Sequence, residues 1–120
     1  MSKILIVEDN EMNRALLIAI LKPEGHELLT AENGQIGVEL ATRELPDLIL
    51  MDVMLPIMNG YDATRRIKAN PATRHIPIVA ITANAVPTER DRALDAGCDG
   101  YITKPVDTRA LPNQLRMFLH

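Results

Sequence analysis

The 120-residue chain has very few aromatic residues and a single cysteine. Phe, Tyr and Trp together make up 2% of the residues and tryptophan is absent, so an aromatic-rich binding surface is not expected. Because 47% of the residues are nevertheless apolar, the core must be built from aliphatic side chains. Cys98 has no second cysteine to pair with, which excludes a disulfide within the chain.

Basic residues are neither abundant nor clustered. Lys and Arg number 13 against 16 Asp and Glu, and the formal net charge is −3. A basic stripe is the electrostatic footprint of nucleic-acid binding, so direct contact with nucleic acid is not expected. The apolar runs are too short to cross a bilayer, and residues 1–4 lack the layout of a signal peptide. The simplest interpretation is one cytoplasmic domain, residues 1–120, without membrane contact.

Short apolar runs alternate with longer segments of helical spacing. The runs have the continuous apolar character of strands buried on both faces, and they cover residues 4–7, 28–31, 48–51, 78–81 and 101–103. Helices are expected after each run, starting near Asn10 and Asn33, near Tyr61, before Arg90, and near Asp107 or Leu111. This alternation predicts an α/β fold, a doubly wound five-stranded parallel sheet with five helices.

Apolar spacing within the helical segments suggests which faces are buried. The expected buried positions are Met12, Ala15, Leu16, Ala19 and Ile20, then Ile36, Leu40 and Ala41, and finally Leu111, Leu115, Phe118 and Leu119. Pro112 leaves two possibilities for the last helix. If that helix starts near Asp107, Pro112 removes one hydrogen bond and kinks it, but if it starts near Leu111, Pro112 lies harmlessly in the first turn.

Polar residues follow the carboxyl ends of the predicted strands: Glu8 and Asp9, then Asp52, Thr82 and Lys104. In sheets of this type ligands bind beyond these ends, so the residues are expected to converge. Three carboxylates in one place repel each other, and Mg²⁺ is the cation that best suits a few hard oxygen ligands. An Asp carboxylate is a competent nucleophile in aspartyl-phosphate chemistry, and an ammonium group neutralises charge on the transferred group. Taken singly, Glu8 and Asp9 could be acids at a helix start and Lys104 a solvated charge; their joint placement favours a site.

Four segments together resemble the receiver domain of bacterial two-component response regulators. They are residues 6–10 with the acidic pair, 52–60, 81–83 and 101–105. The resemblance covers the whole chain and implies a flavodoxin-like architecture. It implies that Asp52 is the phosphoacceptor, that Asp9, Asp52 and the backbone carbonyl of Met54 bind Mg²⁺ directly, and that Glu8 acts mainly through water.

The same resemblance implies roles for the last strands. Lys104 is expected to contact the phosphoryl oxygens, and the peptide bond before Pro105 is expected to be cis. Thr82 and Tyr101 resemble the switch pair, in which the hydroxyl moves toward the phosphoryl group and the ring swings inward. The surface of the fourth helix, fifth strand and fifth helix, residues 87–119, would be the output face. Met54 and Asn84 occupy positions that tend to tune the lifetime of the phosphorylated state.

The function implied is a phosphorylation-activated switch in a two-component phosphorelay. A histidine kinase or histidine phosphotransfer protein would supply the phosphoryl group, and a downstream protein would bind the output face. The chain would catalyse only its own phosphorylation and dephosphorylation, as a monomer or weak dimer. It is either a single-domain regulator, which Met1 directly before the first strand slightly favours, or a receiver cut from a larger protein.

Two other functions fit the predicted architecture less well. An Mg²⁺-dependent phosphohydrolase acting on external substrates generally needs a second acid or base beside the nucleophile, and Val53 and Met54 supply none. A flavin-binding electron carrier would need a phosphate-binding loop after the first strand, where Glu8 and Asp9 repel phosphate in the absence of a metal ion, and aromatic side chains around the ring.

Overall fold

The computed structural model describes residues 2–83 and 87–119, so Asn84 lies outside the described residues. In the described part, one parallel sheet has the strand order β2-β1-β3-β4-β5. The strands are β1 (Lys3–Val7), β2 (Glu27–Ala31), β3 (Leu48–Asp52), β4 (Ile78–Thr82) and β5 (Gly100–Thr103). The order reverses beside β1, where crevices beyond the strand ends form in sheets of this kind.

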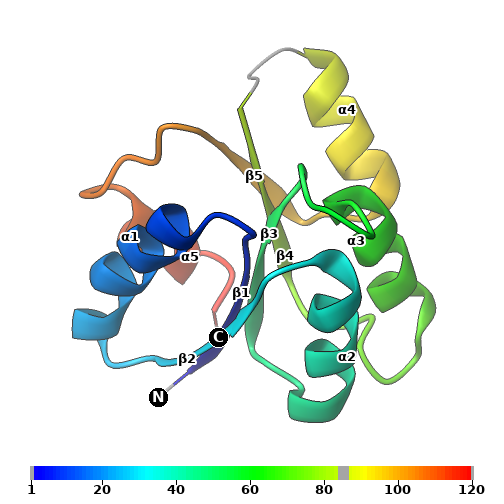
Figure 1. Cartoon of the computed structure of the whole chain (residues 1–120), viewed down its shortest axis with the longest axis horizontal. Coiled ribbons are helices and arrows are strands. Elements are labelled where there is room, and N and C mark those ends of the chain that lie inside the picture. Colours follow the sequence, from blue (N-terminus) through cyan, green and yellow to red (C-terminus); the bar gives the residue numbers. More distant parts are fainter. Residues whose placement is uncertain (1, 84–86, 120) are drawn as a thin grey trace.

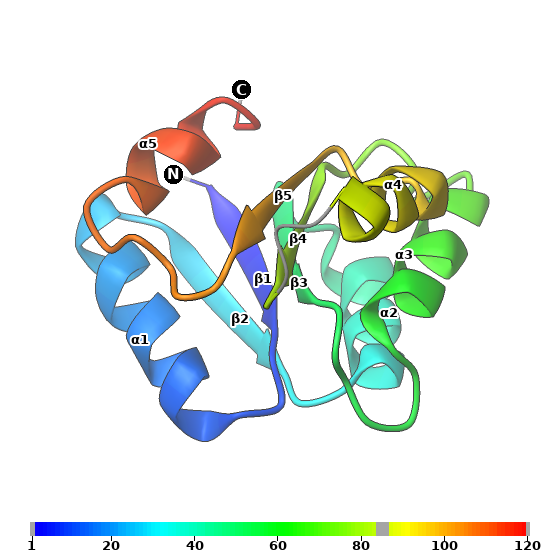
Figure 2. The same ribbon diagram turned by 90° about the horizontal axis from the view of Figure 1, so that it is seen from above.

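Helices cover both faces of the sheet (Figures 1 and 2). They are α1 (Glu11–Leu21), the short 3₁₀ helix η1 (Lys22–Glu24), α2 (Gly34–Glu44), α3 (Gly60–Ala69), α4 (Pro87–Ala96) and α5 (Leu111–Arg116). In Figure 2, α1 and α5 lie on one face, and α2, α3 and α4 on the other. The expected doubly wound α/β fold is confirmed. None of the described helices is long and apolar enough to span a membrane.

Asparagine side chains fix where three helices begin. Asn10, Asn33 and Asn59 each accept a hydrogen bond from the backbone N–H three residues further on, which satisfies an otherwise unpaired donor of the first turn. Such a cap typically stabilises a helix by about 1 kcal/mol. Because all three caps lie in loops that follow strand ends, the helix starts are held close to the carboxyl edge of the sheet.

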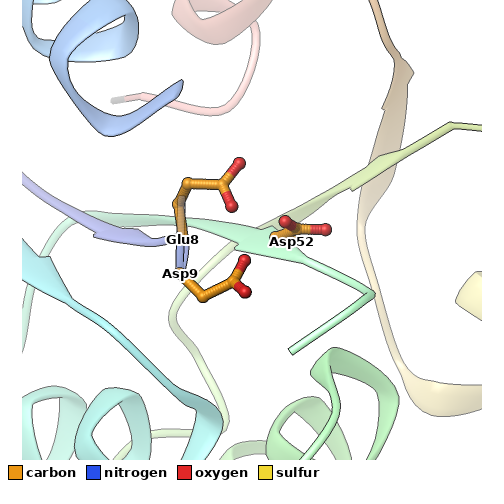
Figure 3. A group of neighbouring side chains, drawn as sticks. All are labelled: Glu8, Asp9 and Asp52. Atoms are coloured by element: carbon orange, nitrogen blue, oxygen red, sulfur yellow. The ribbon is translucent and has the colours of Figure 1, made fainter. Parts of the chain in front are cut away.

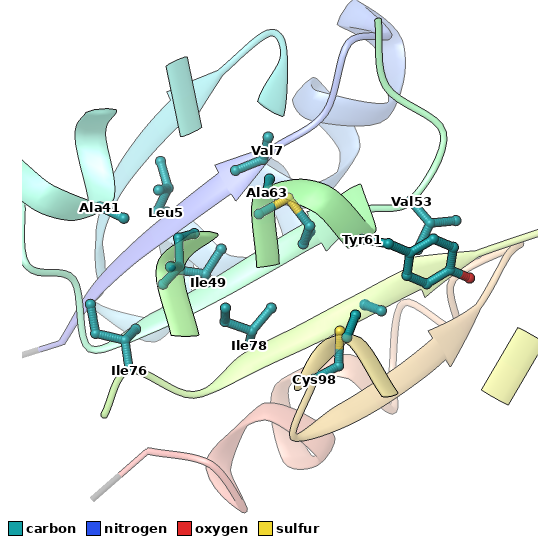
Figure 4. Packing of buried hydrophobic residues seen from close by; sticks show 14 of the residues in the cluster. Leu5, Val7, Ala41, Ile49, Val53, Tyr61, Ala63, Ile76, Ile78 and Cys98 are labelled. Carbon is teal, nitrogen blue, oxygen red and sulfur yellow. The ribbon is translucent and has the colours of Figure 1, made fainter. Parts of the chain in front are cut away.

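The aliphatic core forms one layer on each face of the sheet. Along β1, Ile4 and Ile6 belong to the layer under α1 and α5, whereas Leu5 and Val7 belong to the layer under α2 and α3. Figure 4 shows the second layer, with Leu5, Val7 and Ile49 beside Ala63 of α3. Each fully buried Leu, Ile or Val contributes roughly 1.5–3 kcal/mol, so the two layers hold the strand ends in place.

The expected buried face of α1 is wrong. Met12 is 81% exposed and Leu16 is also exposed, whereas Leu17 and Leu21 are buried against the sheet. The reason is that α1 is apolar on most of its circumference, so spacing alone does not select the face that packs. The expectation for α2 is partly wrong in the same way, because Ile36 is exposed while Ala41 is fully buried.

The structure decides between the two possibilities for the last helix. The α5 helix begins at Leu111, so Pro112 lies in its first turn. A preceding turn is held by Asp107, whose Oδ1 accepts hydrogen bonds from the N–H groups of residues 109 and 110. The helix ends at Arg116, so Phe118, expected on its apolar face, lies beyond its end while still packing against the core.

Candidate functional site

Three carboxylates meet at the carboxyl edge of the sheet (Figure 3). The strands β1 and β3 are neighbours in a register that pairs Val7 with Met51, so the residues that follow them, Glu8 and Asp52, lie at the same level. One carboxylate oxygen from each of Glu8, Asp9 and Asp52 lies within 4.8 Å of the others. Glu8 and Asp52 are only 1% and 2% exposed, whereas Asp9 is exposed to solvent.

Lys104 brings the compensating charge from the end of β5. Its Nζ lies 3.1 Å from Oδ2 of Asp52 and 3.4 Å from Oε1 of Glu8. The Lys104 backbone N–H donates to the carbonyl of Thr82 at 2.7 Å, which fixes where the side chain starts. Burial opposes the charge on this ammonium group, but the hydrogen bond from it to Asp52 and the charges of Asp52 and Glu8 outweigh burial and raise its pKa.

One cation does not balance the buried negative charge. Burial, followed by the hydrogen bond and the negative charge of Asp52, raises the pKa of Glu8 to about 7, and the N–H of Asn10 and the charge of Lys104 offset this only in part. Oε1 of Glu8 is buried and makes no hydrogen bond, although Lys104 is near. A buried carboxylate oxygen without a hydrogen bond, beside two further hard oxygen donors, fits a divalent cation such as Mg²⁺.

The two oxygens of Asp52 are held in different ways. Oδ2 faces the ammonium group of Lys104, while Oδ1 accepts a hydrogen bond of 3.0 Å from the backbone N–H of Met54. The side chain of Met54 itself is largely exposed. Metal binding by the Met54 carbonyl therefore stays a prediction from the resemblance. Two donors therefore fix the orientation of the Asp52 carboxylate, a group that can act as a nucleophile.

Two residues that hold the site were not identified from the sequence. Gly60 starts α3 directly against β3: its N–H donates to the carbonyl of Val53 at 3.1 Å, and a Cβ here would lie 2.2 Å from the carbonyl oxygen of Asp52. Arg14 of α1 donates from Nη1 to the carbonyls of Glu8 and Asp9 at 2.9 and 3.1 Å. A glycine at a helix start and a lone arginine after an acidic pair were the only signals, and neither is specific.

The remaining predicted residues lie around this group. Thr82 is buried at the end of β4, where it lines a small cavity with Val53 and Met54. The peptide bond between Lys104 and Pro105 is cis, as expected. Tyr101 is not part of the acidic cluster; it is half-buried on the edge strand β5 and lines a separate cavity between α4 and α5.

A comparison with protein families places the chain in one of them. The family described as the response regulator receiver domain matches residues 4–116. The chain therefore belongs to this family, as its resemblance to receiver domains suggested. The fold and the three acidic residues at the strand ends agree with this assignment.

Similar proteins include both short and long response regulators. The chain is 36% identical over 116 residues to the polar-differentiation response regulator DivK of Brucella anthropi. The matched residues make up 97% of this chain and 94% of DivK. It is 44% identical over 106 residues to the response regulator PleD of Caulobacter vibrioides, covering 88% of this chain but spanning only 23% of PleD.

One similar solved structure holds a metal ion. It is the receiver domain of a sensor histidine kinase from Pseudomonas aeruginosa, crystallised with a magnesium ion coordinated in the active site cleft. The two structures agree with a TM-score of 0.91 at 38% sequence identity, covering 98% of this chain and 96% of that one.

Proposed function

We propose that Asp52 accepts a phosphoryl group and that this turns the chain into the active form of a phosphorelay switch. Receiver domains of two-component response regulators accept phosphoryl groups as their general function. The observation that carries the assignment to Asp52 is its carboxylate, buried yet held between Lys104 Nζ at 3.1 Å and the N–H of Met54 at 3.0 Å. Among the three clustered acids, Asp52 is the one with both contacts.

The neighbouring residues prepare this carboxylate for attack on phosphorus. One oxygen of Asp52 forms the new bond to phosphorus while the bond to the donor's leaving group breaks. Lys104 is placed to neutralise charge on the phosphoryl oxygens. Asp9, Asp52 and the Met54 carbonyl would hold Mg²⁺, with Glu8 acting through water. When bound, Mg²⁺ would neutralise charge on the phosphoryl oxygens and orient them.

The output of the switch is proposed to pass through Thr82 and Tyr101. A phosphoryl group adds negative charge and strong acceptor oxygens, which can draw a nearby hydroxyl such as that of Thr82. Tyr101 lies beside a cavity of about 330 Å³ that is lined by Leu94 of α4, Gln114 of α5 and Phe118 beyond the end of α5. A ring that moves into or out of such a space changes the surface offered to a target protein.

Partners and compartment follow from the same proposal. A histidine kinase or a histidine phosphotransfer protein is the proposed phosphodonor, since the similar receiver domain of Ssk1 from Saccharomyces cerevisiae was crystallised with the histidine phosphotransfer protein Ypd1. The cytoplasm is the proposed compartment. The chain is proposed to act on no external substrate. Turnover of an added phosphomonoester would contradict this last point.

Intact mass spectrometry tests the proposal. The protein is incubated with a small-molecule phosphodonor and Mg²⁺, and one added phosphoryl group is expected. The adduct should be absent for Asp52→Asn and without Mg²⁺, but present for Asp95→Asn, a matched control that alters an exposed aspartate of α4. An adduct on Asp52→Asn, or no response to a non-hydrolysable phosphoryl mimic in the wild type, would contradict the assignment.

A further inference from the structure

Helix α4 is tied to α3 through one tyrosine. The hydroxyl of Tyr61 donates a hydrogen bond of 2.5 Å to Oε2 of Glu89, and the guanidinium carbon of Arg92 lies 4.8 Å from the centre of the Tyr61 ring. Arg92 also pairs with Oε1 of Glu89 at 3.2 Å. Among residues 2–83 and 87–119, no other side-chain hydrogen bond or ion pair joins α4 to another element.

The tyrosine end of this contact is rigidly placed. Tyr61 is only 5% exposed and its ring packs in the core beside Val53, with the hydroxyl at the rim of the cluster (Figure 4). The preceding residue, Gly60, lies in close contact with the backbone of Asp52. Burial, followed by the hydrogen bond to Glu89, raises the pKa of Tyr61 to about 12, so the hydroxyl keeps its proton and remains a donor at neutral pH.

The helix end of the contact borders a cavity whose lining includes residues next to Asp52 and at the end of β4. Glu89 and Arg92 line a cavity of about 150 Å³ together with Tyr61. The other residues that line this cavity are Val53, Met54, Asn59, Thr82 and Ala83. The cavity thus lies where α4 meets the loop after Asp52 and the end of β4, beside the candidate site.

From this geometry we infer that Tyr61 is a positioning residue for the phosphorylation site, which sets through Glu89 and Arg92 how closely α4 covers that site. The inference rests on the proposed phosphorylation of Asp52. Hydrogen bonds to an ionised acceptor are stronger than neutral ones, and a cation over a ring adds attraction, so the contact favours the position of α4 beside this cavity.

The consequence concerns water. Loss of the phosphoryl group requires a water molecule to attack phosphorus, whereupon the bond to the Asp52 oxygen breaks and phosphate and a free carboxylate result. When the contact to Tyr61 is removed, α4 is expected to move away from the cavity more often. Water then reaches the phosphoryl group more easily, and the phosphorylated state should decay faster.

Two measurements on the whole chain test the inference. Hydrogen–deuterium exchange of unphosphorylated protein reports opening of residues 87–96, and intact mass after removal of the phosphodonor reports phosphoryl loss. Tyr61→Phe, which keeps the ring, should raise exchange about tenfold, as expected for loss of a hydrogen bond to a charged group, and phosphoryl loss about threefold or more. Glu89→Gln keeps an acceptor oxygen and should have a smaller effect.

A matched variant distinguishes loss of the Tyr61 contact to α4 from a general destabilisation of α3. Arg65→Gln removes the exposed Arg65–Asp62 pair of 2.9 Å on the same helix α3 and should leave both rates within about twofold of wild type. Unchanged phosphoryl loss in Tyr61→Phe, with or without faster exchange, overturns the inference. So does an equal effect of Arg65→Gln. A wild-type protein that takes no phosphoryl group contradicts the proposed function instead, so the two failures are distinguishable.

Discussion

The two tyrosines of the chain mark two regions of opposite character. Tyr61 lies where α3 meets α4, nearly buried, with its hydroxyl bonded to Glu89 and its ring under Arg92. Tyr101 lies on β5 at the edge of the sheet and is only half-buried. In the part of the chain that the structure describes, its hydroxyl makes no hydrogen bond.

The difference follows from position in the sheet. Tyr61 is held on several sides because α3 packs over a central strand, whereas an edge strand leaves one side open. A ring that is packed on several sides can hold a neighbouring helix in place, whereas a ring on an open edge has room to move. The proposed roles agree with this contrast: Tyr61 positions α4, and Tyr101 moves with the switch.

The largest expected effect concerns Gly60, where the start of α3 lies against the backbone of Asp52. Gly60→Ala places a Cβ 2.2 Å from the Asp52 carbonyl oxygen, far inside van der Waals contact, so α3 must shift. The free energy of unfolding should fall by about 3 kcal/mol or more, measured by urea denaturation. Gly25→Ala is the control: it has a positive φ but open space and should cost only about 1 kcal/mol. Equal effects would show that α3 is not anchored by this contact.

The next effect concerns the buried carboxyl group of Glu8 at the end of β1. Glu8 has a pKa of about 7 in the fold against about 4.5 for an ordinary glutamate, so the folded state binds its proton more tightly than the unfolded chain. The resulting stabilisation is complete below about pH 4.5, is lost as pH rises through about 7, and is on the order of 3 kcal/mol.

Urea denaturation of metal-free protein at several pH values measures this change. Glu8→Gln has no proton to lose at this position, so its stability should fall less between these pH values. Mg²⁺ should restore part of the loss at neutral pH, because it binds the folded state. An identical pH dependence in wild type and variant would show that Glu8 does not carry the effect.

A direct comparison of the tyrosines is expected to give an intermediate effect. Tyr61→Phe removes a nearly buried hydrogen bond to a carboxylate and should lower the free energy of unfolding by about 1–2 kcal/mol. Tyr101→Phe removes a partly exposed hydroxyl and should change it by less than about 0.5 kcal/mol. Thermal or urea denaturation of both variants measures the two changes. Equal losses in the free energy of unfolding would contradict the difference between the two tyrosines.

The smallest effect is expected in the loop before α3. Ile57 has a φ of 66°, a left-handed conformation that is strained for a β-branched residue, and its side chain is exposed. Ile57→Gly should relieve this strain at some cost in entropy and stabilise the fold by roughly 0.5–1 kcal/mol. A lower midpoint in urea would show instead that the Ile57 side chain contributes to stability.

Much of the fold was predictable from local patterns. Continuous apolar runs such as residues 48–51 and 78–81 are long enough for buried strands and too short for helices, and both became central strands. Asn10 and Asn33 indicated helix starts because their side chains cap the first turn. The acidic cluster was predictable because parallel strands bring their carboxyl ends to one edge.

The helix faces were less predictable. Met12 and Leu17 are both apolar residues of α1, but only Leu17 meets the sheet. The end of α5 was also missed, since Phe118 packs on the core from a turn rather than from a helix. Spacing gives the period of a helix but not its rotation about its own axis when apolar residues surround it.

By itself the sequence determined the succession of strands and helices along the chain, the aliphatic character of the core, and the set of acids and the lysine at the strand ends. Each of these depends on neighbouring residues or on the geometry common to all parallel sheets. Only the tertiary structure decided that α3 starts against Asp52 and that Tyr61 reaches Glu89, 28 positions along the chain. Contacts of that kind depend on how the helices pack against the sheet and against each other, and a local sequence pattern does not contain this information.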